Sequence, residues 1–128
     1  ELEFITGKND IEDGVTAIRS KYSIPLITVT KGKFGSEAFF DDGEVSLHTS
    51  KPTFMKVKTI DTTGAGDTFT ACVLHDILEN GYKTFTQERL GEILIFANAA
   101  SSLITTKKGA LCVMPDKTEI EALIQFGN

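Results

Sequence analysis

The chain has 128 residues, of which 41% are hydrophobic and 24% charged, and this balance favours a single globular domain over a disordered or repetitive chain. Eighteen acidic residues against thirteen basic ones give a net charge of -5, which argues against a nucleic-acid-binding face. No apolar run approaches the roughly 20 residues of a membrane span, and residues 1–4 do not resemble a signal peptide, so we expect a cytoplasmic protein without a membrane partner.

The N-terminal residues predict two helical segments. Phe4 to Gly7 have the pattern of a helix end. Residues 10–21 predict an amphipathic helix, with Asn9 or Asp10 as its cap and Pro25 beyond its end.

Three strands are expected next. Residues 26–30 form a short apolar and β-branched run, which is typical of a strand buried in a parallel sheet, and a helix followed by a strand is the α/β pattern. A turn at residues 31–35 then leads to strands at 36–40 and 44–48, which flank Asp41–Gly43 as a hairpin.

The second half predicts a strand, a glycine turn and long helices. Apolar residues near alternate positions indicate a strand over 54–60, and the apolar residues from Phe69 to Ile77 fall at helical spacing. A largely buried helix over 86–106 follows, and Asp116 caps a last helix through Leu123. Few strands are available for a complete central sheet, so we expect one domain or a piece of one.

One strip of the long helix is polar. It consists of residues three or four positions apart, namely Asn98, Ser101, Ser102 and Thr105. The strip therefore faces one side of the helix, and a loop over 106–110 follows it.

The cysteines and histidines lack the spacing of a metal site. Cys72 lies on the apolar face of a predicted helix and Cys112 in an apolar run, so we interpret both as reduced core residues. His48 and His75 have no cysteine or carboxylate at ligand spacing, which argues against a metal role.

The stretch from Asp61 to Asp67, Asp-Thr-Thr-Gly-Ala-Gly-Asp, is the strongest functional signal. Its two glycines allow a ligand to approach the backbone, and the first N–H groups of the following helix suit a phosphate. The alternative is a plain connection in which Gly64 and Gly66 accommodate positive φ. Four polar side chains around two glycines exceed what such a turn needs, and the stretch matches neither the Gly-Lys-Ser/Thr phosphate loop nor the three-glycine dinucleotide motif.

This stretch, continued through Thr68 and Phe69, closely resembles the C-terminal signature of the ribokinase-like sugar kinases, the PfkB carbohydrate kinase family. Three further matches follow in the expected order, at residues 30–35, 96–100 and 105–110. The resemblance covers the whole chain, 1–128, but only the C-terminal, ATP-binding part of the family's three-layer α/β/α fold. It therefore implies an α/β domain without the family's N-terminal half and small β-sheet lid.

The resemblance implies specific roles in phosphoryl transfer. Asp67 corresponds to the catalytic base that takes a proton from a sugar hydroxyl as it attacks the γ-phosphate of ATP. The backbone N–H groups of Gly64, Ala65 and Gly66 would bind the transferring phosphoryl group. The cofactor-binding turn is formed by Thr30, Lys31, Gly32, Lys33, Phe34 and Gly35. Asn98 corresponds to a position that approaches the adenine, with a helix-packing hydrogen bond as the structural alternative.

Two cation sites are implied as well. The family's monovalent-cation site, for which potassium is the candidate, corresponds to the side chains of Asp61 and Thr63 and the carbonyls of Ile104, Lys107, Gly109 and Val113. Glu1 corresponds to the last residue of an Asn-x-x-Glu motif linked to Mg²⁺, but the Asn is absent. Mg²⁺ is also expected because phosphoryl transfer from ATP needs its charge neutralised.

The overall amino-acid sequence is most similar to fructokinases. The alternatives are 2-keto-3-deoxygluconate kinase, ribokinase and nucleoside kinases of the same fold. A non-catalytic nucleotide-binding fragment is a further alternative, because the sugar-contacting half has no counterpart here. The expected partner is a small-molecule sugar, and pairing through the lid in relatives implies a homodimer of the intact protein.

Overall fold

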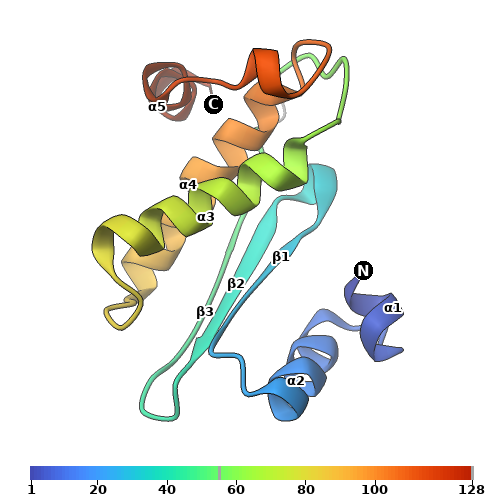
Figure 1. Ribbon diagram of the computed structural model, residues 1–128, viewed down its shortest axis with the longest axis vertical. Coiled ribbons are helices and arrows are strands. Elements are labelled where there is room, and N and C mark those ends of the chain that lie inside the picture. The colour runs from blue at the N-terminus through green and yellow to red at the C-terminus, as the bar shows by residue number, and fades with distance from the viewer. Residues whose placement is uncertain (55, 128) are drawn as a thin grey trace.

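The computed structural model describes residues 1–54 and 56–127, which form an antiparallel three-stranded sheet surrounded by helices (Figure 1). The strands lie in chain order as β1 (Leu26–Thr30), β2 (Ser36–Asp41) and β3 (Ser46–Lys51). The helices are α1 (Leu2–Thr6), α2 (Ile11–Tyr22), α3 (Ala65–Asn80), α4 (Gln87–Ile104) and α5 (Lys117–Phe126), with short 3-10 turns at Gly32–Phe34 and Leu111–Val113. These layers confirm the expected α/β class.

The helix ends follow the capping signals of the sequence. The Asp10 side chain accepts a hydrogen bond from the Asp13 amide at the start of α2, and Asp116 forms a complete capping box with Glu119 at the start of α5. Gly7, at φ 66°, ends α1 as expected. Helix α5 continues one turn beyond the expected Leu123.

The expectation of a parallel sheet at residues 26–30 was wrong for the described chain. Strand β1 pairs with β2 in antiparallel register, with Leu26 opposite Phe40 and Thr30 opposite Ser36, and it is only half-buried. The turn at 31–35 reverses the chain directly after β1, so the next strand returns alongside it. No second partner of β1 occurs within residues 1–54 and 56–127.

The hairpin is confirmed, with a longer turn than expected. Asp42 accepts hydrogen bonds from the amides of Glu44 and Val45, so both residues belong to the turn. Strand β3 therefore begins at Ser46 and continues to Lys51.

The predicted strand over 54–60 was also wrong in the part that can be described; Met55 lies outside the described residues. The chain leaves the sheet at Pro52 and crosses the end of α4, where the amides of Ile60 and Asp61 donate to the Thr105 carbonyl at 2.7 and 3.1 Å. Phe54 is buried against the helices instead of a strand. Phe54 therefore owes its place in the apolar pattern to packing on helices, and Ile60, at the other end of the pattern, is exposed.

The core lies between the sheet and the two long helices, which lie across it in Figure 1. Ala38 and Phe40 project from β2 into this core, where α4 contributes Leu94 and Ala97 with no exposed surface. Helix α5 covers the other side of α4, with Ile120 as its buried anchor. Helix α4 is thus buried on several sides, as its broad apolar surface predicted.

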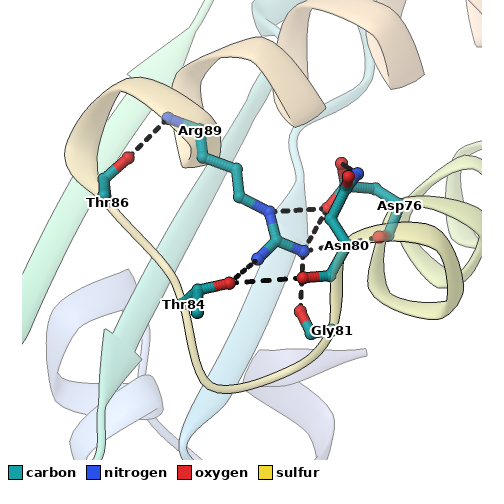
Figure 2. A network of polar contacts seen from close by, with 6 residues as sticks. All are labelled: Asp76, Asn80, Gly81, Thr84, Thr86 and Arg89. Atoms are coloured by element: carbon teal, nitrogen blue, oxygen red, sulfur yellow. Dashed lines mark hydrogen bonds and ion pairs between the residues drawn. The ribbon is translucent and has the colours of Figure 1, made fainter.

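Arg89 connects α3, α4 and the loop between them (Figure 2). Its guanidinium donates to the Asp76 carboxylate from Nε at 2.9 Å and from Nη2 at 2.5 Å, and further to the Gly81 carbonyl and the Thr84 hydroxyl. It also lies 4.4 Å from the centre of the Phe85 ring. Sequence patterns gave no indication of this network, because its members are separated by an irregular loop.

Two side-chain expectations need correction. Cys112 was expected in the core but is exposed, because it lies on a surface 3-10 turn; Cys72 is half-buried, and burial raises the pKa of its thiol. His48 is not isolated, since its Nε2 lies 2.8 Å from the Glu37 carboxylate on the neighbouring strand.

In the part of the chain that the structure describes, no helix is both long and apolar enough to span a bilayer.

We predict that Arg89→Met lowers the free energy of unfolding by about 2–3 kcal/mol, because it leaves the Asp76 carboxylate and two loop acceptors without their donor. Urea denaturation measures this change. The matched control is Lys117→Met, whose exposed ammonium lies 3.8 Å from Glu121 and should change stability by less than about 0.5 kcal/mol. Equal effects of the two substitutions would contradict the prediction.

Candidate functional site

The glycine turn leads directly into α3, and its two glycines differ in what they require. Gly64 caps the helix at φ 81°, and a Cβ there would lie 2.9 Å from the Cβ of Ala110. Gly66 lies within the first turn of α3, and a Cβ there would meet no protein atom within 4 Å. Backbone conformation and packing therefore explain the first glycine but not the second. Space beside Gly66 fits an approaching ligand.

The amides at the start of α3 are partly free. The Ala65 N–H donates to the Thr62 carbonyl at 3.2 Å, so the structure differs from the expectation that it binds an anion. Within the described residues, the amides of Gly64, Gly66 and Asp67 have no acceptor, as is usual before the first helical hydrogen bond. The amides of Gly64, Gly66 and Asp67, here called the anion cradle, are therefore available to an anion. Asp67 takes the place that was expected for Ala65.

A cavity of about 410 Å³ lies between this turn, the 31–35 turn and α4. The polar strip of α4 forms one wall, which confirms that its members face the same side: Asn98, Ser101, Ser102 and Thr105. The expected cofactor-binding residues along this cavity are Thr30, Gly32, Lys33, Gly35 and Gly66. Most of the expected nucleotide-side residues are thus brought together.

A second cavity, of about 660 Å³, lies between α1, α2, β1 and the start of α3. Asp67, Glu1 and Lys31 line it, so the expected base and the expected Mg²⁺-linked residue share one cavity. Gly66 lines both cavities. The first turn of α3 therefore stands between them.

The remaining two residues of the 31–35 turn do not face the first cavity. Lys31 Nζ lies 2.6 Å from the Glu37 carboxylate, and the Phe34 ring is 71% exposed. Burial raises the pKa of Glu37, but hydrogen bonds from Lys31 and His48 outweigh it, so its pKa lies below the usual range. The pairing therefore stabilises the fold above the ordinary Glu pKa and is lost as the pH falls through the lowered value.

Asn98 lies in the cavity wall, but its amide is already fully engaged. Its Oδ1 accepts from the Ser36 hydroxyl at 2.9 Å, and its Nδ2 donates to the carbonyls of Lys51 and Pro52. Only 4% of the residue is exposed. Asn98 therefore makes the packing hydrogen bonds of the structural alternative, and it also lines the first cavity.

Asp61 joins the glycine turn to the loop after α4. Its carboxylate accepts hydrogen bonds from the amide and hydroxyl of Thr63 and from the Gly109 amide, which lies 3.2 Å away. Hydrogen bonds from the Thr63 hydroxyl and amide and from the Gly109 amide lower the pKa of Asp61, and the positive charge of Lys108 lowers it further. The two expected side-chain ligands, Asp61 and Thr63, thus contact each other, and Asp61 also contacts the loop to which the expected carbonyl ligand Gly109 belongs.

Ser101 makes a contact in the site that the sequence did not predict. Its hydroxyl donates to the Ala65 carbonyl in the first turn of α3 at 2.9 Å. The polar strip placed Ser101 on the cavity side, but no pattern in the sequence shows which carbonyl it meets.

Free amides and a carboxylate at one helix start, between two cavities of an α/β domain, are features typical of phosphate-binding α/β proteins. A sequence profile described as "pfkB family carbohydrate kinase" matches residues 1–117. The chain belongs to the pfkB family of carbohydrate kinases.

Individual relatives agree with this family. The chain is 37% identical over 125 residues to fructokinase-1 of Zea mays, covering 98% of this chain and 37% of that protein. A double mutant of Vibrio cholerae O395 fructokinase, solved with fructose, ADP and potassium, is 31% identical with a TM-score of 0.79, over 97% of this chain and 38% of that one. The structure of Arabidopsis thaliana ribokinase with ribose and ATP is 32% identical with a TM-score of 0.75, over 98% of this chain and 38% of that one. The chain thus spans little more than a third of these relatives and has their ribokinase-like fold.

We predict opposite outcomes for alanine at the two glycines. Gly64→Ala should lower the free energy of unfolding by roughly 1–3 kcal/mol, because alanine is strained at positive φ and would press on Ala110. Gly66→Ala should leave stability unchanged or slightly raised, yet lower turnover of the intact protein by about 10²-fold, because its methyl group enters the space between the cavities. Urea denaturation and steady-state kinetics measure the two effects. A fully active Gly66→Ala variant would refute the ligand-approach interpretation, whatever its stability.

Proposed function

We propose that this chain is the ATP-binding part of a kinase that transfers the γ-phosphate of ATP to a sugar hydroxyl. One observation carries the proposal: the first turn of α3 separates a cavity lined by the nucleotide-side residues from a cavity lined by Asp67. A phosphoryl group passing from one ligand to the other would cross at Gly66, beside amides that have no internal acceptor among the described residues.

Asp67 is the proposed catalytic base. It lies in the first turn of α3, is exposed to the second cavity, and accepts no hydrogen bond from any described side chain, so its carboxylate is available to a ligand. In this role it takes the proton of the attacking hydroxyl. The amides of Gly64, Gly66 and Asp67 stabilise the negative charge on the phosphoryl oxygens, without needing to reorganise during the reaction.

On the nucleotide side, the backbone of the 30–35 turn and the ammonium of Lys33 hold the donor. Lys33 is the charged side chain among those that line the first cavity, so it is the group suited to the phosphates. Asn98 acts there by fixing the cavity wall, because its polar atoms are already bonded.

Cations would complete the charge balance. ATP carries the transferable phosphoryl group, and Mg²⁺ when bound neutralises its charge. On this chain, Glu1 is the proposed Mg²⁺-linked residue, because it lines the cavity of Asp67. Asp61 and Thr63, with the carbonyls of Ile104, Lys107, Gly109 and Val113, are proposed to hold potassium, the ion present in the Vibrio cholerae structure.

Fructose is the proposed acceptor. The Zea mays sequence relative is a fructokinase, and the Vibrio cholerae fructokinase structure contains fructose. A ribokinase with ribose is similarly close in fold, so ribose is the alternative to be tested directly. The sugar-contacting half of the family lies outside this chain's match, and discrimination between sugars rests there.

We predict that Asp67→Asn lowers kcat of the intact kinase by 10²- to 10⁴-fold, the usual effect of removing a positioned base, while the Kd for ATP stays within about threefold. Steady-state kinetics and isothermal titration measure these quantities. The matched control is Asp13→Asn on α2, outside both cavities, which should behave as the wild type. Normal turnover in Asp67→Asn would refute the assignment.

The substrate is tested by comparing fructose, ribose, 2-keto-3-deoxygluconate and adenosine as acceptors for the intact protein. ADP formation is the readout. We expect the highest kcat/KM with fructose. The 128-residue chain alone should bind ATP without acceptor-dependent ADP formation, and an intact protein that binds ATP but phosphorylates none of the four would support a non-catalytic module instead.

A further inference from the structure

The turn that carries the proposed cradle is held by α4 at both of its ends. At the near end, the Thr105 carbonyl accepts from the amides of Ile60 and Asp61 at 2.7 and 3.1 Å. At the far end, the Ser101 hydroxyl donates to the Ala65 carbonyl at 2.9 Å. Ser101, in the last turn of α4, and Thr105, its C-cap, therefore hold the glycine turn from the same end of the helix.

The first turn of α3 needs such support because burial does not hold it. Gly66 and Asp67 are exposed, and the buried part of α3 begins only at Thr68 and Phe69. The other half of the helix is fixed by the Arg89–Asp76 network (Figure 2). Among the described residues, Ser101 makes the side-chain hydrogen bond that joins α4 to the first turn, and we find no other.

We propose that Ser101 is a positioning residue, which holds the first turn of α3 so that its free amides and Asp67 keep their alignment between the two cavities. This role rests on the proposed kinase function. The Ala65 carbonyl also belongs to the α3 backbone ladder, so the added hydrogen bond restrains the turn without displacing a helical one. Loss of this hydrogen bond should change the alignment of the first turn of α3 more than the affinity for ATP, because Ser101 acts through the backbone of that turn.

The test compares Ser101→Ala with Ser101→Thr and Ser102→Ala in the intact protein. Ser101→Ala removes the donor, and Ser101→Thr keeps a hydroxyl at the same position. Ser102 is the matched serine, because its hydroxyl bonds to the Asn98 carbonyl and to Thr53, neither of which belongs to α3.

Two readouts are measured. Hydrogen exchange of the hydrogen-bonded amides of Ala65 and Thr68, without ligand, should become several-fold faster in Ser101→Ala and stay unchanged in Ser101→Thr and Ser102→Ala. In kinetics with ATP and fructose, Ser101→Ala should lower kcat by about tenfold with KM for ATP changed less than twofold, and Ser101→Thr should restore kcat.

The outcomes separate this proposal from the kinase function. Unchanged exchange and unchanged kcat in Ser101→Ala would overturn the positioning role. A raised KM for ATP with unchanged kcat and exchange would also overturn it, in favour of direct nucleotide contact. If the wild type phosphorylates no sugar, the kinase function fails, while the exchange measurement still decides whether Ser101 holds the turn.

Discussion

The buried amide of Asn98 is the interaction on which the site depends. It binds β2 through Ser36 and the end of β3 through the carbonyls of Lys51 and Pro52, and so fixes α4 relative to the sheet. A buried polar group left without its partners costs about 1–3 kcal/mol, which makes this arrangement strongly preferred over alternatives. Because α4 then supports the glycine turn, this buried side chain and the apolar packing of α4 together fix where the exposed turn lies.

Much of the fold could be predicted because local signals agreed with the tertiary structure. The capping residues Asp10 and Asp116 marked helix starts, and the polar strip on α4 marked the side that faces the cavity. The glycine turn was recognisable from a contiguous motif. Such features are encoded within a few residues, so the sequence alone reveals them.

The errors arose where partners lie far apart along the chain. Strand β1 has the composition of a buried parallel strand, but its described partner is antiparallel and was determined by the tight turn after it. Phe54 packs on helices and not on a strand, and alternation alone cannot distinguish these cases. The Ala65 amide was predicted to be free, but it closes the turn on Thr62, a contact set by backbone geometry that side-chain identity does not encode.

The two cysteines differ in a way that could serve experiments on this protein. Burial keeps the Cys72 thiol protonated and therefore a weak nucleophile, whereas Cys112 is exposed next to the loop that meets Asp61. Of these two cysteines, a maleimide dye would therefore react with Cys112. Its emission would report on movement of that loop without any engineered labelling position.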